Sequence, residues 1–163
     1  MDPLRSTDVS RRRLFAQLIG TVAALIGGSR LASAQAKPPF MVYKDAGCDC
    51  CQRWVEQMQQ QGYKVTVTDA VMGPIKQKYK VPPKLVSCHT TLVGTYVIEG
   101  HVPAPDIAKL LARKPKGVIG LAVPGMPASA PGMDQVPFVP YSVLTFDALG
   151  VTTVFAQHDA PGR

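Results

Sequence analysis

The sequence predicts an α/β domain organised around a cysteine cluster at the turn between its first strand and its first helix. The short apolar run 40–43 predicts a strand over 40–44. From Cys51 onward, apolar residues recur at the i, i+3, i+4 and i+7 positions of one helix face. Cys48, Cys50 and Cys51, three of the four cysteines, lie where these two elements meet. A strand followed directly by a helix is the usual beginning of an α/β fold.

The rest of the first half continues this alternation. The first helix is predicted over 50–61, and Gly62, which follows it, is a residue type that commonly ends a helix. Alternating β-branched residues predict a second strand over 64–68, and a short helix over 75–79 ends before the prolines at 82–83. The β-α-β-α order favours a parallel pairing of the first two strands.

The second half predicts two further strands and one helix. The strands are expected over 85–91 and 96–99. The helix, over 105–113, has apolar residues on one face and basic residues near its end. The complete order, β-α-β-α-β-β-α, is that of a thioredoxin-like domain.

The remainder of the chain has a different composition. Residues 118–140 contain two similar Pro-Gly-Met steps and predict a loop with little regular structure. Alternating residues at 141–146 and 151–155 predict a β-hairpin, and the tail is expected to fray from His158. The predicted fold is therefore a thioredoxin-like domain with a Pro/Gly/Met-rich loop and a C-terminal β-hairpin.

The first 34 residues have the order of a secretory signal peptide, with an amphipathic N-terminal helix as the alternative. Arginines at 11–13 form a twin-arginine signature, and an apolar run follows over 14–28. Small residues at 32–34 supply a cleavage site, with 34–36 as an alternative. The apolar run is short and rich in glycine, so it is not expected to span a membrane. We predict that residues 1–34 are removed and that 35–163 form one periplasmic domain, with no stable membrane span after cleavage.

The charge of the chain argues against one class of function. The formal net charge is +7 at pH 7, but part of it lies in the predicted signal peptide. No basic run is interleaved with aromatic residues. Nucleic-acid binding is therefore not expected.

The cysteine cluster suits dithiol chemistry. Cys48 and Cys51 form a C-x-x-C pair at a helix start, as in dithiol oxidoreductases. The free amide groups and the dipole of the helix end favour thiolate over thiol there. Cys50 complicates this interpretation, because a third adjacent thiol invites disulfide scrambling. The blander alternative is a structural disulfide or small buried side chains.

Metal binding is the other hypothesis for these thiols. Cys50 and Cys51 are adjacent, which makes them awkward ligands for one tetrahedral zinc ion, and only Cys88 remains to complete a set. A compact group of thiolates suits monovalent copper better, including several ions bridged by sulfur. A zinc-stabilised binding module is the less favoured alternative.

Other candidate ligands lie further along the chain. Met126 and Met133 lie on the predicted loop, and thioether sulfur prefers Cu(I), although both could equally fill gaps in a core. His89, next to Cys88, is a candidate ligand or proton carrier, or else a surface histidine. His101 is expected to be structural.

Four motifs, taken together, resemble one known family. They are Cys-Asp-Cys-Cys at 48–51 followed by Trp54, Ser-Cys-His-Thr at 87–90, Tyr-Val-Ile-Glu-Gly-His-Val-Pro-Ala at 96–104, and Gly-Leu-Ala-Val-Pro-Gly-Met-Pro at 120–127. This combination is similar to the DUF411 family, also described as CopG-like periplasmic copper proteins. The resemblance covers roughly 40–155.

The resemblance implies a thioredoxin-like fold, an exported location and a part in copper handling. It also implies that Cys48, Cys50, Cys51 and Cys88 together bind copper, and that the protein interconverts Cu(I) and Cu(II) or exchanges copper in a resistance system. The leading prediction is therefore an exported copper-binding protein, with copper oxidoreductase activity as a further possibility. Its expected partners are copper ions and other copper-handling or electron-transfer proteins. The alternative is a thiol-disulfide oxidoreductase acting on exported proteins.

Overall fold

The computed structural model describes residues 36–160. The signal peptide predicted for 1–34 lies outside these residues. The described chain is a mixed α/β structure with three α-helices and one short 3-10 helix. Its elements are β1 (Phe40–Lys44), α1 (Asp49–Gln60), β2 (Val65–Asp69), α2 (Met72–Lys78), η1 (Pro83–Leu85), β3 (Thr90–Val93), β4 (Tyr96–Glu99), α3 (Ala104–Arg113), β5 (Val118–Ala122), β6 (Tyr141–Asp147) and β7 (Thr152–His158).

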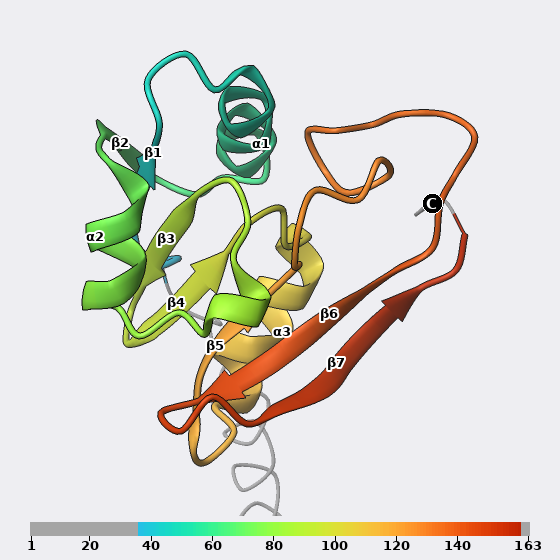
Figure 1. Cartoon of the computed structure of the whole chain (residues 1–163). Helices are drawn as coiled ribbons and strands as arrows, with labels where there is room; N and C mark the ends of the chain where they lie inside the picture. Colours follow the sequence, from blue (N-terminus) through green and yellow to red (C-terminus); the bar gives the residue numbers. More distant parts are fainter. Residues whose placement is uncertain (1–35, 161–163) are drawn as a thin grey trace, which may run out of the picture. The chain divides into compact units, whose positions relative to one another are not determined.

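All the strands belong to one sheet, in the order β2-β1-β3-β4-β5-β6-β7 (Figure 1). β1 pairs with β2 in parallel, as predicted, and β4 pairs with β5 in parallel. The other neighbours are antiparallel. The predicted order β-α-β-α-β-β-α is found from β1 to α3, with η1 inserted before β3.

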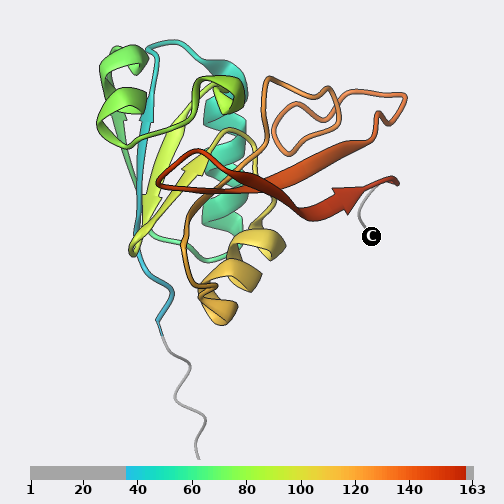
Figure 2. The same ribbon diagram turned by 60° about the horizontal axis from the view of Figure 1, so that its bottom comes forward.

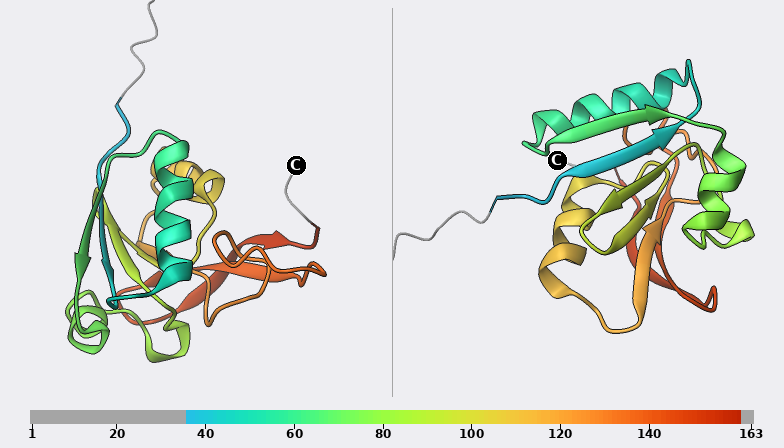
Figure 3. Two further views of the ribbon diagram at one scale, coloured as in Figure 1. Left: turned by 90° about the horizontal axis from the view of Figure 1, so that it is seen from above. Right: turned by 90° about the vertical axis from the view of Figure 1, so that its left-hand side faces the viewer.

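Two apolar cores cover the two faces of the sheet. The larger joins α1 and α3 to the sheet through residues such as Trp54, Ile107 and Ile98, and Figure 3 shows both helices on the same side of the strands. The smaller core contains Val97 and Phe146. Val97 and Ile98 are neighbours on β4 and contribute to different cores, because successive side chains of a strand point to opposite faces.

The sheet continues where the sequence predicted a loop. Residues 118–122 form β5, which pairs with β4 on one side and β6 on the other, so the predicted start of the loop is wrong. The physical reason is close packing at Gly120. A Cβ there would lie 2.1 Å from the Val97 carbonyl oxygen and 2.4 Å from a Phe146 ring carbon. This glycine is needed for strand packing and does not mark a turn.

The region before β3 also differs from the prediction. A strand was expected over 85–91, but Pro83–Leu85 form a 3-10 turn and β3 begins only at Thr90. Ser87 makes an isolated bridge to Gly125. Cys88 and His89 therefore lie on a turn at the start of a strand, not within its ladder.

The predicted C-terminal hairpin is present as β6 and β7, which pair antiparallel. Figure 2 shows this ribbon with the preceding loop running beside it. His158 does not begin a frayed tail. It is the last residue of β7, and its Nε2 lies 2.8 Å from Asp106 Oδ2. Among residues 36–160, no helix is long and apolar enough to cross a membrane.

Candidate metal centre

The first turn of α1 presents three cysteines at one end of the sheet. Gly47 has a φ of +74°, a conformation that glycine adopts readily, and it leads the chain from β1 into the helix. Cys48 is the N-cap residue, and its carbonyl oxygen accepts a hydrogen bond from the Gln52 amide at 3.1 Å. Cys50 and Cys51 follow in the first turn, so the three sulfurs are set by one short stretch of backbone.

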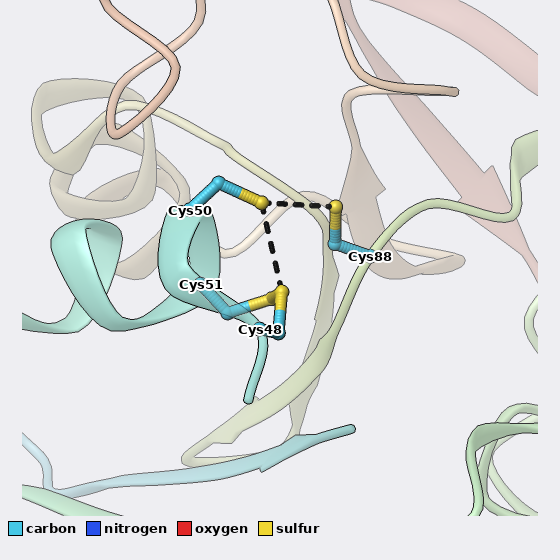
Figure 4. A group of neighbouring side chains, drawn as sticks. All are labelled: Cys48, Cys50, Cys51 and Cys88. Carbon is cyan, nitrogen blue, oxygen red and sulfur yellow. Dashed lines mark hydrogen bonds between the residues drawn. A yellow bond between two sulfur atoms is a disulfide. The ribbon is translucent and has the colours of Figure 1, made fainter. Parts of the chain in front are cut away.

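All four cysteine sulfurs lie within 4.8 Å of one another (Figure 4). Cys48 and Cys51 form a disulfide with a Cα–Cα distance of 5.4 Å. Cys50 Sγ lies 3.6 Å from both Cys48 Sγ and Cys88 Sγ. Cys51 is buried, and the other three are partly exposed. In this oxidised form, Cys50 and Cys88 are the free thiols.

Cys88 reaches the cluster through the sheet, although it is 37 residues beyond Cys51 in sequence. β3 pairs antiparallel with β1, which brings the turn before β3 beside the end of β1 that leads into α1. The Ser87 side chain donates a hydrogen bond to the Gly125 carbonyl. A Cβ at Gly100 would lie 2.2 Å from Ser87 Oγ, so the turn packs directly on a glycine backbone. These contacts hold Cys88 in place.

A buried ion pair lies next to this turn, and the sequence pattern did not predict it. Lys76 Nζ is 2.6 Å from Glu99 Oε1, and Thr90 Oγ1 donates to Glu99 Oε2 at 2.6 Å. The Ser87 amide donates to Glu99 Oε1 at 2.7 Å. Burial raises the pKa of Glu99, and the charge of Lys76 opposes that shift. The feature of the sequence that could have indicated this ion pair is Glu99, a charged residue at the end of an otherwise apolar strand.

The Cys88 thiol is held in its protonated form. Burial raises its pKa to about 12, and the hydrogen bond with the Cys50 thiol adds to the shift. A cation bound by the Cys88 sulfur must therefore displace its proton.

The thiols open onto a surface pocket of about 460 Å³. Cys48, Cys50 and Cys88 line it, together with Lys76 and Met126. The exposed fraction of Met126 is 59%, so its thioether is free to approach the sulfurs. Met133 is on the same loop but is partly buried against the larger core, and it does not line this pocket.

His89 is fully buried, away from the pocket wall. Its ring centroid lies 4.5 Å from that of Trp54 and 5.0 Å from that of His101. Burial holds the pKa of His89 well below its ordinary value and also lowers the pKa of His101, so both rings are neutral near pH 7. The surface alternative for His89 is therefore wrong.

The loop after β5 covers the first turns of α1. Arg53 Nε donates to the Gly132 carbonyl at 2.7 Å, and Gln57 Nε2 donates to Asp134 Oδ2 at 2.9 Å. A Cβ at Gly132 would lie 2.8 Å from both the Cys50 carbonyl oxygen and the Trp54 amide nitrogen. The Pro/Gly/Met-rich segment thus packs closely on the helix that carries the cysteines and covers it.

Comparison with known proteins identifies the class to which this fold and cysteine cluster belong. A family model described as "Protein of unknown function, DUF411" matches residues 85–133. Two solved structures, titled "Copper resistance protein copG", Form 1 and Form 2, are each 37% identical to the chain with a TM-score of 0.70. The alignments cover 77% and 75% of this chain and 99% and 98% of those chains, respectively. The chain therefore belongs to the DUF411 family of CopG-like proteins, as its motifs predicted.

No curated protein sequence matches the chain. The copper resistance relatives and the group of four cysteines support a role in copper handling.

Proposed function

We propose that the protein is an exported copper-binding protein that holds Cu(I) through Cys48, Cys50, Cys51 and Cys88. The observation that carries this proposal is the convergence of all four sulfurs within 4.8 Å of one another, where Cys48, Cys50 and Cys88 line a solvent-open pocket. Thiolates that are close enough to be shared between ions suit Cu(I), which accepts sulfur ligands in low coordination numbers. Copper is the cargo of this site, and the name of the solved relatives points to the same metal.

The disulfide adds a route for interconverting Cu(I) and Cu(II). When the Cys48 and Cys51 thiols join, the S–S bond forms, two electrons leave the sulfurs and both thiol protons pass to solvent. Two Cu(II) ions accept one electron each and become Cu(I). In the reverse direction, two Cu(I) ions are oxidised as the disulfide opens. The protein therefore alternates between two redox states: the oxidised form with the Cys48–Cys51 disulfide, and a reduced form with four free thiols.

Further features complete the proposal. The β-α-β-α-β-β-α order of the first four strands and three helices, with the cysteines at the start of the first helix, supports a thioredoxin-like domain. Met126 lines the pocket and is exposed, which supports it as a further copper ligand. Met133 and His89 do not line the pocket and are the less favoured candidate ligands of this cluster. The twin-arginine segment directs the protein to the periplasm, where other copper-handling or electron-transfer proteins are its expected partners.

The test is metal analysis of anaerobically reduced protein after incubation with Cu(I) and removal of unbound metal. Wild-type protein should retain copper against a Cu(I) chelator, and Cys50→Ser and Cys88→Ser should each lower its stoichiometry or affinity while remaining folded. Asp69→Ala, a change at the exposed end of β2, is the matched control and should leave copper binding unchanged. Retention of zinc in place of copper, or full copper binding by both cysteine variants, would overturn the four-sulfur site.

A second function is favoured by one observation, the Cys48–Cys51 disulfide at a helix start with Cys48 partly exposed. This is the arrangement of a thiol-disulfide oxidoreductase acting on exported proteins. Metal-free protein of this class would reduce or reshuffle the disulfides of an unfolded substrate, and Cys50→Ser would retain that activity. If substrate disulfides are exchanged only at the rate of a simple dithiol, the copper function stands alone.

A further inference from the structure

A second group of potential ligands shares Cys51 with the four-sulfur cluster. Cys51 Sγ and ring nitrogens of His89 and His101 all lie within 4.8 Å of one another. The exposed fraction of each of these three residues is 0%. They come from three separate elements: the first turn of α1, the turn before β3, and the turn between β4 and α3. The fold therefore brings one thiol and two imidazoles together in its interior.

The hydrogen bonds of these imidazoles are incomplete. Among residues 36–160, four buried side-chain nitrogen or oxygen atoms have no hydrogen-bond partner within the protein, and three of them are ring nitrogens of His89 and His101. Buried polar atoms are nearly always paired in folded proteins, because leaving them unpaired costs free energy. A cluster of three such atoms calls for an explanation.

The backbone determines which nitrogen of His101 is available. His101 Nδ1 lies 2.7 Å from the Pro131 carbonyl oxygen, which can only accept, so Nδ1 carries the proton and donates it. In the neutral ring, Nε2 then bears a lone pair, and it has no partner. A histidine whose second nitrogen donates to a carbonyl is typical of metal ligands, because that hydrogen bond fixes the tautomer and the ring orientation.

The surrounding groups hold the rings rigidly but leave both nitrogens of His89 unpaired. The Trp54 ring lies against His89, and its Nε1 donates to the Val102 carbonyl at 3.0 Å, next to His101. The His89 and His101 rings meet edge to face at 77°. The packing holds both rings close to Cys51 and leaves three of their four nitrogens without a hydrogen bond.

We propose that, after reduction of the Cys48–Cys51 disulfide, Cys51 Sγ, His89 and His101 Nε2 bind one copper ion in a buried site distinct from the four-sulfur cluster. The proposal rests on the proposed function, since both sites need the free Cys51 thiol and both take copper. A set of one thiolate and two imidazoles in trigonal arrangement is a copper donor set in proteins. Structural zinc sites need four ligands, and the buried group supplies three.

Copper can bind this buried site only after an external dithiol has reduced the Cys48–Cys51 disulfide. The dithiol gives two electrons and two protons, the Cys48–Cys51 bond breaks, two thiols form, and the dithiol becomes a disulfide. The Cys51 proton is released to solvent when its sulfur binds copper. The same sulfur then belongs to both groups and links the buried ion to the copper in the pocket.

The experiment compares variants of the reduced full chain loaded anaerobically with Cu(I). The chain has three histidines, which allows a matched control. His89→Phe/His101→Phe should bind about one copper equivalent fewer than wild type, and X-ray absorption should lose the imidazole scattering around copper. His158→Gln alters the third histidine, which pairs with Asp106 outside the site, and should change neither measurement.

A second variant separates this proposal from the four-sulfur proposal. Cys50→Ser/Cys88→Ser keeps Cys51 and both buried histidines, so it should retain about one copper equivalent with nitrogen and sulfur neighbours. Copper with only sulfur neighbours in wild type, or no copper in this variant while wild type binds it, would overturn the buried site and leave the four-sulfur site standing. A wild-type protein that binds no copper would overturn both.

Discussion

Two buried polar groups border the cysteine cluster, and they differ in how their hydrogen bonds are completed. In the Lys76–Glu99 group, the carboxylate receives hydrogen bonds from an ammonium, a hydroxyl and a backbone amide. In the His89–His101 group, three ring nitrogens have no partner. Thr90 and Glu99 of the first group lie at the same ends of β3 and β4 as His89 and His101 of the second group, and Lys76 comes from α2.

The difference indicates different roles. A completed network in a low-dielectric interior fixes the backbone around it, here the turn that carries Cys88. An incomplete one weakens the fold unless another species supplies the missing partner. The Lys76–Glu99 group therefore has a structural role in holding the turn that carries Cys88. The His89–His101 group has the properties expected of metal ligands in a metal-free protein. The following changes test that contrast, beginning with the largest expected effect.

Glu99→Ala should be the most destabilising change. It leaves the buried Lys76 ammonium without its counter-charge, and breaking a buried pair in this way costs about 3–5 kcal/mol. Denaturant unfolding of the metal-free protein measures this. Asp69→Ala is the control, because it breaks the Lys44 pair at a carboxylate with 58% exposure and should cost about 1 kcal/mol or less. If the two changes lower the free energy of unfolding equally, the Lys76–Glu99 group does not have this structural role.

The histidine group should make metal-free stability depend on pH. Burial lowers both histidine pKa values, so below pH 6.5 the unfolded chain takes up protons that the folded chain does not. Stability is fully present above this pH and is lost as the pH falls, at up to about 1.4 kcal/mol per pH unit for each ring. The measurement is urea unfolding between pH 8 and pH 5.

The matched variant isolates this contribution. The folded His89 ring also faces His101 and the charge of Lys76, and His101 faces Arg53 and Asp134. Glu99 has a raised pKa and contributes a slope of the opposite sign, but it is present in both proteins. His89→Phe/His101→Phe should therefore lose the acid-side slope that wild type shows. Identical slopes in the two proteins would contradict the assignment.

Removing one unpaired imidazole should not harm the metal-free protein. At pH 8, His89→Phe replaces a ring with two unpaired nitrogens by an apolar ring of similar shape, and should raise the free energy of unfolding by about 1 kcal/mol. In copper-loaded protein the change should instead lower stability, because a ligand is lost. A loss of stability in the metal-free protein would show that His89 is simply a core residue.

The smallest effect is expected at the open side of the pocket. Met126→Leu removes an exposed thioether and should weaken Cu(I) binding by less than tenfold, or about 1.4 kcal/mol. Met133→Leu is the comparison, and it should weaken Cu(I) binding less than Met126→Leu does, since Met133 packs against the core. Chelator competition measures both, and a larger loss at Met133 would reverse their roles.

The sequence predicted the features that depend on local pattern. Helix periodicity located α1 with its cysteines, and the four motifs identified the family to which the chain belongs. The prediction failed at β5, because Gly120 was taken as a loop residue when a glycine there is required by the contacts of two neighbouring strands.

The two buried polar groups could not be predicted for a related reason. Glu99 pairs with Lys76, which is 23 residues away in sequence. The tautomer of His101 is set by its hydrogen bond to the Pro131 carbonyl, 30 residues away. Nothing in the spacing of these residues signals the pairing. His101 was therefore expected to be structural, although it lies in one group with Cys51 and His89 and its Nε2 has no hydrogen-bond partner.

The fitted contact of Gly132 on the first turn of α1 has a consequence for the order of synthesis. The three clustered cysteines leave the ribosome about eighty residues before the segment that covers them, since Gly132 contacts the backbone of Cys50 and Trp54. During that interval the nascent chain carries adjacent thiols without their cover. Under the proposed twin-arginine export, the chain would fold in a reducing compartment, which would protect these thiols until residues 118–140 are in place. The cluster would then reach an oxidising compartment only after its cover had formed.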